Sequence, residues 1–180
     1  MKSPLFFGLI GAVVAMILII VIGSSLGGGE TINEQSISLK YYIDGVTEVI
    51  DEYQDYVKSP KLRSSSASLG SILSNTSKDL TNFLTDTYGF KDDSKSYPKL
   101  RETAELSRDA LMDDLFNAKI GGTLDRIYAH KMAYEIELIM EEESDIYDKT
   151  PNETLKSLLE TSYNSLENLY KDFDDFSESK

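Results

Sequence analysis

The chain has 180 residues, with 18 Lys or Arg against 31 Asp or Glu, so its formal net charge at pH 7 is −13. This length allows one membrane or targeting element and one compact domain. The acidic balance argues against a nucleic-acid-binding protein, because such proteins need excess positive charge to neutralise phosphates. Cysteine is absent, which excludes disulfides, thiolate metal sites and a cysteine nucleophile, and the single histidine, His130, excludes paired histidine ligands.

Residues 5–22 form a continuous run without a charged or polar side chain. As a helix that rises about 1.5 Å per residue, this run would be roughly 27 Å long, enough to cross a thin bilayer. Lys2 precedes the run and the next basic residue is Lys40, so the positive-inside rule places residues 1–4 in the cytoplasm. We therefore predict a single-pass signal anchor in the cell membrane, with an extracytoplasmic C-terminal domain.

A cleaved signal peptide is the alternative for this run, since Gly23, Ser24 and Ser25 are small residues suited to cleavage. The chain would then be secreted after cleavage near Ser25. The run is longer than the roughly 7–15 residues of a usual signal core, which favours the anchor. Small residues on one side of the predicted membrane helix would let two such helices pack closely. They are Gly8, Gly11, Ala12 and Ala15.

Residues 23–30 predict a flexible Gly/Ser tether, and residues 31–180 predict a helical bundle. Apolar residues at alternating spacings of four and three mark a buried seam on successive helices. The first seam comprises Leu39, Ile43, Val46, Ile50, Tyr53 and Val57. The second, polar at two of its six positions, comprises Leu69, Leu73, Thr76, Leu80, Phe83 and Thr87. The last comprises Leu155, Leu159, Ser162, Leu166, Leu169, Phe173 and Phe176.

Capping residues, prolines and glycines predict where the helices begin and end. The first start is marked by a capping box at Thr31 and Glu34, and Ser59-Pro60 ends this helix or begins the next, which stops at Gly89. Pro98 and a cap at Thr123 mark the next two starts. The last start is marked by Thr150-Pro151-Asn152-Glu153, with Thr150 as cap and Glu153 as capping-box glutamate. The pair Gly121-Gly122 is either a turn or a kink. The predicted fold is therefore all-α: an N-terminal transmembrane helix followed by an antiparallel bundle of four or five helices.

An acidic run without a basic residue ends the fourth predicted segment. Carboxylates at the C-terminal end of a helix oppose its dipole, and a broken local rule sometimes marks a functional site. A basic partner or a divalent cation such as calcium or magnesium would relieve the repulsion, although no 12-residue calcium loop is present. A solvated, solubilising face is the alternative. The run contains Glu135, Glu137, Glu141, Glu142, Glu143, Asp145 and Asp148.

No other pattern predicts a cofactor, metal or catalytic residue. A di-iron site needs Glu three residues before each histidine ligand, but Ile127 stands three residues before His130. Haem held by His130 with Met132 or Met140 is conceivable in a bundle, but His130 lies off the main apolar stripe, as a surface histidine would. The serines lack a Gly-x-Ser-x-Gly pattern, and we predict that the protein is not an enzyme.

Two further features bear on the surface of the domain. Tyrosines recur at or beside the seams, as core residues with a hydroxyl at the boundary or as part of a partner-binding surface. Asn75-Thr76-Ser77 and Asn152-Glu153-Thr154 match the glycosylation sequon, which also arises often by chance.

These observations lead to one expectation and two alternatives for function. We expect a non-enzymatic, membrane-anchored protein that mediates interaction or assembly at the cell envelope, by binding another envelope protein or itself. One alternative is a ligand- or cation-binding sensory bundle that signals through a separate membrane partner. The other is a structural spacer.

Overall fold

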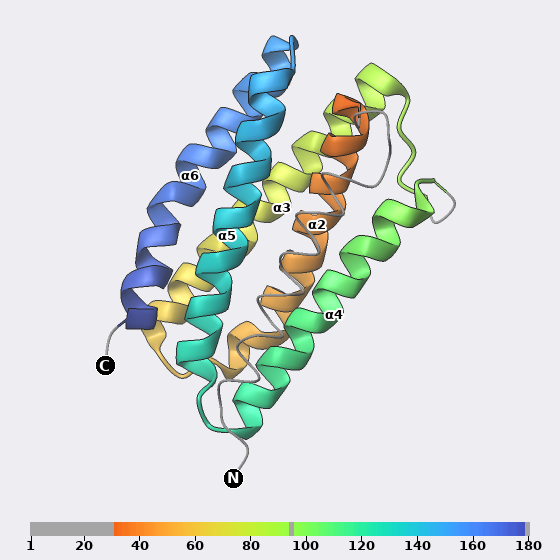
Figure 1. Ribbon diagram of the computed structural model, residues 1–180. Coiled ribbons are helices and arrows are strands. Elements are labelled where there is room, and N and C mark those ends of the chain that lie inside the picture. The colour runs from red at the N-terminus through yellow and green to blue at the C-terminus, as the bar shows by residue number, and fades with distance from the viewer. Residues whose placement is uncertain (1–30, 94–95, 179–180) are drawn as a thin grey trace.

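The structure, a computed structural model, describes residues 31–93 and 96–178. These residues are all-α and form five helices packed as a bundle (Figure 1). The glycines at 121–122 form a turn, and so the bundle has five helices within these ranges. The helices are α2 (Ile32–Tyr53), extended by a 3₁₀ turn (Gln54–Tyr56), α3 (Pro60–Tyr88), α4 (Pro98–Ile120), α5 (Leu124–Lys149) and α6 (Glu153–Glu178).

Four helices form an antiparallel ring in the order α2, α3, α6, α5 (Figure 1). Hydrogen bonds between helices show the opposed directions. Thr76 in the middle of α3 donates to Ser162 on α6 at 2.9 Å, whereas Ser65 near the start of α3 donates to Asp172 near the end of α6 at 3.3 Å. The predicted antiparallel arrangement therefore holds for these four helices.

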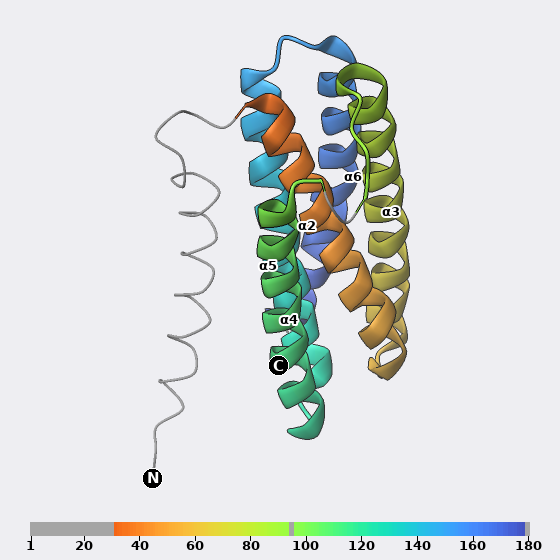
Figure 2. The same cartoon turned by 90° about the vertical axis from the view of Figure 1, so that its right-hand side faces the viewer.

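The fifth helix, α4, lies outside the ring against α2 and α5 and runs parallel to α2 (Figure 2). Arg101, early in α4, donates to the Tyr41 hydroxyl at 3.2 Å, and Tyr53, late in α2, donates to the Met112 carbonyl at 3.0 Å. The prediction of a wholly antiparallel bundle is therefore wrong for α4. The chain reverses after α3, but α4 then packs beside α2 instead of α3, so these two neighbours share a direction.

A buried lysine of α2 and a half-buried arginine of α4 help to hold α4 and the connection before it against α2. Lys40, 4% exposed, forms ion pairs with Asp44 at 2.8 Å and with Asp92, and Arg101 forms a second pair with Asp92 at 2.9 Å. Burial lowers the pKa of Lys40, but hydrogen bonds from Lys40 to Asp44 and Asp92 outweigh it and raise the pKa overall. The amine therefore stays charged inside the protein, with its partners in place.

The predicted seams meet in one core. All six residues of the first predicted seam are buried, although the last of them, Val57, follows the 3₁₀ turn and is not in α2. Those of α3 are buried from Leu69 to Phe83, whereas Thr87 is exposed. On α6, Leu155, Leu159, Ser162, Leu166 and Phe173 are buried, and Phe173 packs on Tyr128 of α5 with ring centroids 6.5 Å apart. Apolar burial along these seams is the main stabilising contribution to the fold.

Several helix ends agree with their local signals. Thr31 and Glu34 form the predicted capping box, in which the Glu34 N–H donates to the Thr31 hydroxyl at 3.3 Å and the Thr31 N–H to the Glu34 carboxylate at 3.1 Å. Ser59 caps α3, with Pro60 in its first turn. Gly89 ends α3 at a φ of 67°, in the left-handed region that favours glycine.

Two predicted caps are wrong. The Thr123 side chain does not cap α5, and its hydroxyl donates instead to the Ala118 carbonyl at 3.5 Å. At the start of α6 the cap is Asn152, whose Oδ1 accepts from the N–H groups of Thr154 at 2.9 Å and Leu155 at 3.2 Å. Thr150 follows the last residue of α5. Proline between Thr150 and Asn152 keeps the chain extended there, which delays the helix start by two residues.

None of the helices in the described ranges has the length and hydropathy needed to cross a membrane. The predicted anchor at 5–22, its packing residues Gly8, Gly11, Ala12 and Ala15, and the tether at 23–30 lie outside the described residues.

Candidate functional site

The structure divides the seven predicted acidic residues of α5 between surface and core. Glu135 and Glu143 are only 8% and 1% exposed, so the predicted acidic surface is corrected by removing these two. Because an α-helix turns once in 3.6 residues, acidic residues distributed over positions 135–148 cannot all lie on one face of the helix. The five that remain exposed or half-buried are Glu137, Glu141, Glu142, Asp145 and Asp148.

A groove of about 540 Å³ runs between α5 and α6, and we call it the acidic groove. Its acidic side chains come from α5, at spacings of four, four and three that place them on one face of that helix: Glu137, Glu141, Asp145 and Asp148. Opposite them, α6 contributes Tyr163 and Tyr170, which are seven residues apart and therefore on one face. No Lys, Arg or His lines this groove.

Most of the carboxylates in the acidic groove lack a partner within the described part of the chain. Asp145 is the exception, since Lys149 forms an ion pair with it and the Gln35 amide donates to it at 3.2 Å. Glu137, Glu141 and Asp148 have neither a hydrogen bond nor an ion pair there. The negative charge of the groove is therefore largely uncompensated.

Carboxylates of the acidic groove contribute to the raised pKa values of two tyrosines: Tyr170, which lines the groove, and Tyr134 of α5, which does not. The Asp174 carboxylate, burial and the Glu137 carboxylate together raise the pKa of Tyr170. Burial and the Glu135, Glu137 and Glu141 carboxylates raise the pKa of Tyr134 in the same way. A negative potential disfavours a further negative charge, so the acidic groove attracts cations and repels anions.

The shape of the acidic groove suits an extended cationic group. Its carboxylates span eleven residues of α5, or about 16 Å at 1.5 Å per residue. Lys and Arg side chains pair with carboxylates and also stack on tyrosine rings, so both kinds of lining residue can contact one basic segment. Within the described ranges, no three Asp, Glu or His side chains are grouped as a metal ion would require.

The two buried carboxyl groups belong to the core and not to the groove face. Glu135 accepts a hydrogen bond from the Tyr42 hydroxyl of α2, and burial raises its pKa to about 7. Burial raises the pKa of Glu143 to about 8, although the nearby Ser162 hydroxyl offsets part of the rise. Neither Glu143 oxygen accepts a hydrogen bond of good geometry. These groups therefore titrate near neutral pH.

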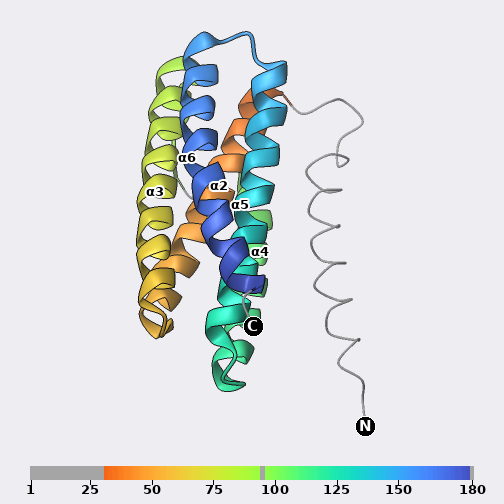
Figure 3. The same cartoon turned by 90° about the vertical axis from the view of Figure 1, so that its left-hand side faces the viewer.

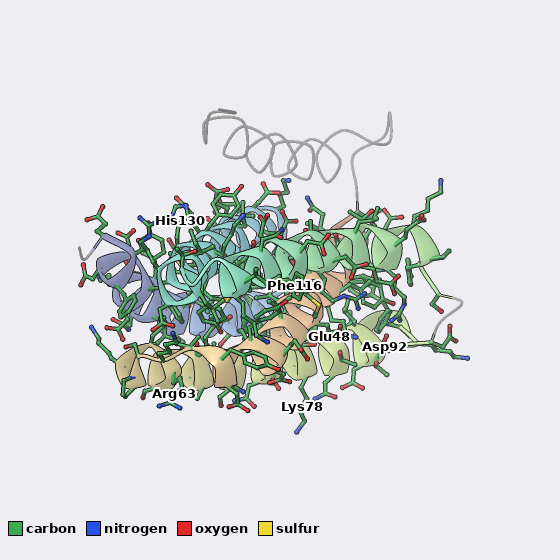
Figure 4. All side chains as sticks on the ribbon, turned by 90° about the horizontal axis from the view of Figure 1, so that it is seen from below. Glu48, Arg63, Lys78, Asp92, Phe116 and His130 are labelled. Atoms are coloured by element: carbon green, nitrogen blue, oxygen red, sulfur yellow. The ribbon has the colours of Figure 1, made fainter. Side chains whose placement is uncertain are left out.

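The residues considered for haem do not converge. His130 is exposed on α5 (Figure 4), whereas Met132 is fully buried. Met140 lines the acidic groove, half-buried, so it lies apart from both. The sequence indicates tyrosines at or beside the seams, among them Tyr163 and Tyr170, but does not assign these two to the acidic surface. Their seven-residue spacing was the available signal, but only the packing of α6 on α5 brings them opposite the carboxylates.

No family model, no curated protein and no solved structure matches this chain.

Proposed function

We propose that this protein is a non-enzymatic, membrane-anchored interaction protein of the cell envelope whose acidic groove binds a basic segment of another envelope protein. The observation that carries the proposal is a groove lined by four carboxylates and two tyrosines, with no basic side chain among its lining residues. Such a lining matches Lys and Arg side chains in both charge and shape.

The position of the acidic groove relative to the proposed anchor narrows the choice of segment. Gln35, one turn after Thr31 at the start of α2, contacts Asp145 at the edge of the groove. If residues 5–22 cross the membrane, the tether at 23–30 delivers the chain to this end of the bundle. The groove then lies on the membrane-proximal side of the bundle, within reach of extracytoplasmic segments of other membrane proteins. A basic extracytoplasmic segment held close to the membrane is the partner that this position favours.

Charge reversal in the acidic groove tests the proposal. The full chain is expressed in its native membranes with Glu137→Lys, Glu141→Lys and Asp148→Lys, and partners are captured by cross-linking in gentle detergent. A matched control carries Glu102→Lys, Glu105→Lys and Asp113→Lys, which change the net charge equally at exposed positions of α4. We expect a stoichiometric partner with wild type and the control, and loss of that partner with the groove variant.

Salt dependence supplies a second readout of the same complex. An interface built on partly exposed charges weakens as salt screens them, so raising the salt from about 0.05 to 0.5 M should release the partner. A partner that both charge-reversed variants retain, or that salt does not release, would contradict the role of the acidic groove. Recovery of the bare chain alone would contradict the proposal as a whole.

A further inference from the structure

Helix α6 lies between α3 and α5 (Figure 3). A second groove, of about 610 Å³, is lined by α3 and by α6 with Asn152 before it. We call it the polar groove. Of its fifteen lining residues, twelve carry a hydroxyl, amide or carboxylate group, and ten of these twelve are uncharged. The other three are Ile72, Phe83 and Leu158, and the lining contains no basic residue. Most of this groove therefore offers neutral hydrogen-bonding groups.

The polar positions of two predicted seams meet in this groove. Thr76 and Thr87 interrupt the apolar seam of α3, Ser162 interrupts that of α6, and all three line the polar groove. Thr76 and Ser162 are both buried and hydrogen-bonded to each other at 2.9 Å. Leucine at seam positions would stabilise the bundle more, since burying a hydroxyl is unfavourable even when it is bonded. Departure from the apolar pattern on both facing helices indicates a role other than stability.

A row of alternating amides and carboxylates follows the α3 side of the polar groove. Asn75, Asp79, Asn82 and Asp86 stand at spacings of four, three and four, which places them on one face over about 16 Å. None of these four side chains has a hydrogen bond or ion pair within the described residues. On the α6 side, the exposed hydroxyls of Thr154 and Ser157 are likewise unused there. The groove thus presents solvent-exposed donors and acceptors along both walls.

The chemistry of these groups selects among ligand classes. Asn both donates and accepts hydrogen bonds, Asp accepts only, and a hydroxyl does either. A chain of sugar hydroxyls, which themselves donate and accept, can satisfy all of them at once. An anionic polymer would be repelled by Asp79 and Asp86. An organic cation would use these two and leave unmatched the neutral side chains that make no bond within the described residues, which are Asn75, Asn82, Thr87, Thr154 and Ser157.

We propose that the polar groove binds an uncharged oligosaccharide, with the α3 row of Asn75, Asp79, Asn82 and Asp86 as its main hydrogen-bonding partner. This site is separate from the acidic groove and needs no membrane anchor, so its success or failure is independent of the proposed interaction with a basic partner. The half-buried Ile72 and Leu158 supply contact for the carbon faces of the sugar rings.

The experiment measures binding of neutral hexasaccharides of glucose and N-acetylglucosamine to the full chain in lipid nanodiscs, by calorimetry. We expect at least one probe to bind with a Kd in the range of about 10 μM to 10 mM. The double variant Asp79→Ala with Asn82→Ala should weaken that binding about tenfold. The matched control, Asp113→Ala with Asn117→Ala, removes the same groups from the exposed surface of α4 and should change the affinity less than about twofold.

A third variant tests whether the probe binds in the polar groove, and it leaves the four polar residues of the α3 row unchanged. Ser157→Phe places a ring in the polar groove and should abolish binding of the same probe, while circular dichroism confirms an unchanged helical bundle. Absence of binding by every probe at about 10 mM would overturn the proposal, as would equal affinities of the groove and control variants. Displacement of the probe by spermidine at equal concentration would overturn it too, because it would reveal a cation site.

The chain's own sequons provide the last test. Asn75 and Asn152 both line the polar groove, and both are the asparagine of a sequon. The intact mass of the protein from its native membranes should equal that of the unmodified polypeptide, which leaves the row open to a separate oligosaccharide. A glycan attached at Asn75 would overturn the proposal, because the row would then be covered by the protein's own sugar.

Discussion

Glu143 illustrates how a single buried group links the pH to the stability of this bundle. Burial raises the pKa of this carboxyl to about 8 in the folded state, against an ordinary value of 4.5. Between these two values the unfolded chain releases the proton while the folded chain retains it, so folding takes up a proton. The stabilisation is complete below pH 4.5 and is lost as the pH rises through about 8.

We therefore expect the free energy of unfolding of the wild type to fall between pH 4.5 and about 8, with Glu143 contributing up to about 4 kcal/mol of the loss. Glu143→Gln keeps the shape and removes the titration, so this variant should lose markedly less stability over the range. The residual loss comes from Glu135, whose pKa is raised to about 7. Urea denaturation at several pH values measures the effect.

Glu160→Gln is the control for this comparison, since Glu160 is exposed on α6 and should leave the pH dependence as in the wild type. Equal slopes for Glu143→Gln and the wild type would show that the Glu143 carboxyl is not what links pH to folding.

At the scale of the helix, the cap that the local sequence predicts for α6 differs from the cap that the structure contains. Asn152 accepts from two N–H groups at the beginning of α6, whereas the Glu153 carboxylate pairs with Lys156 at 3.6 Å, on the surface. Loss of a capping side chain exposes unsatisfied N–H groups and lowers helix stability by about 1 kcal/mol. Loss of an exposed ion pair within one helix changes stability by less than about 0.5 kcal/mol.

We accordingly expect Asn152→Ala to lower the free energy of unfolding by about 1 kcal/mol and Glu153→Ala to change it by less than about 0.5 kcal/mol. Chemical denaturation of both variants, at one pH and salt concentration, provides the comparison. The opposite order would mean that Glu153 takes part in capping α6 as a capping-box glutamate, which is the role that the sequence pattern alone predicts for it.

For the whole molecule, attachment of the bundle to the membrane depends on whether residues 5–22 are retained as an anchor or cleaved. An uncleaved anchor keeps the chain in the membrane pellet after an alkaline wash, and protease added from outside the cell should digest the bundle while leaving the first residues protected. The intact mass of the membrane-bound protein should then include residues 1–30. A soluble protein whose first residue lies near Ser25 would identify the run as a cleaved signal peptide instead.

Much of the helical architecture follows from local patterns. The first seam from Leu39 to Val57, the capping box at Thr31 and the stop at Gly89 depend on residues within one or two turns, and each is present in the structure. By contrast, the partners of α4 were not predictable. Periodicity indicates which face of a helix is buried, but it carries no information about which helix covers that face.

The same limit applies to both grooves. Composition and periodicity identified an acidic run on one helix, tyrosines on another and polar interruptions in two seams. Only the packing of α6 between α5 and α3 places Tyr163 and Tyr170 opposite Glu137 and its neighbours, and Thr76 against Ser162. That packing also buries Glu135 and Glu143 and leaves the rest of the acidic run accessible. Local sequence sets the chemistry of each helix face, and contacts between residues far apart in the chain decide which faces meet, because they depend on the shape of the assembled core.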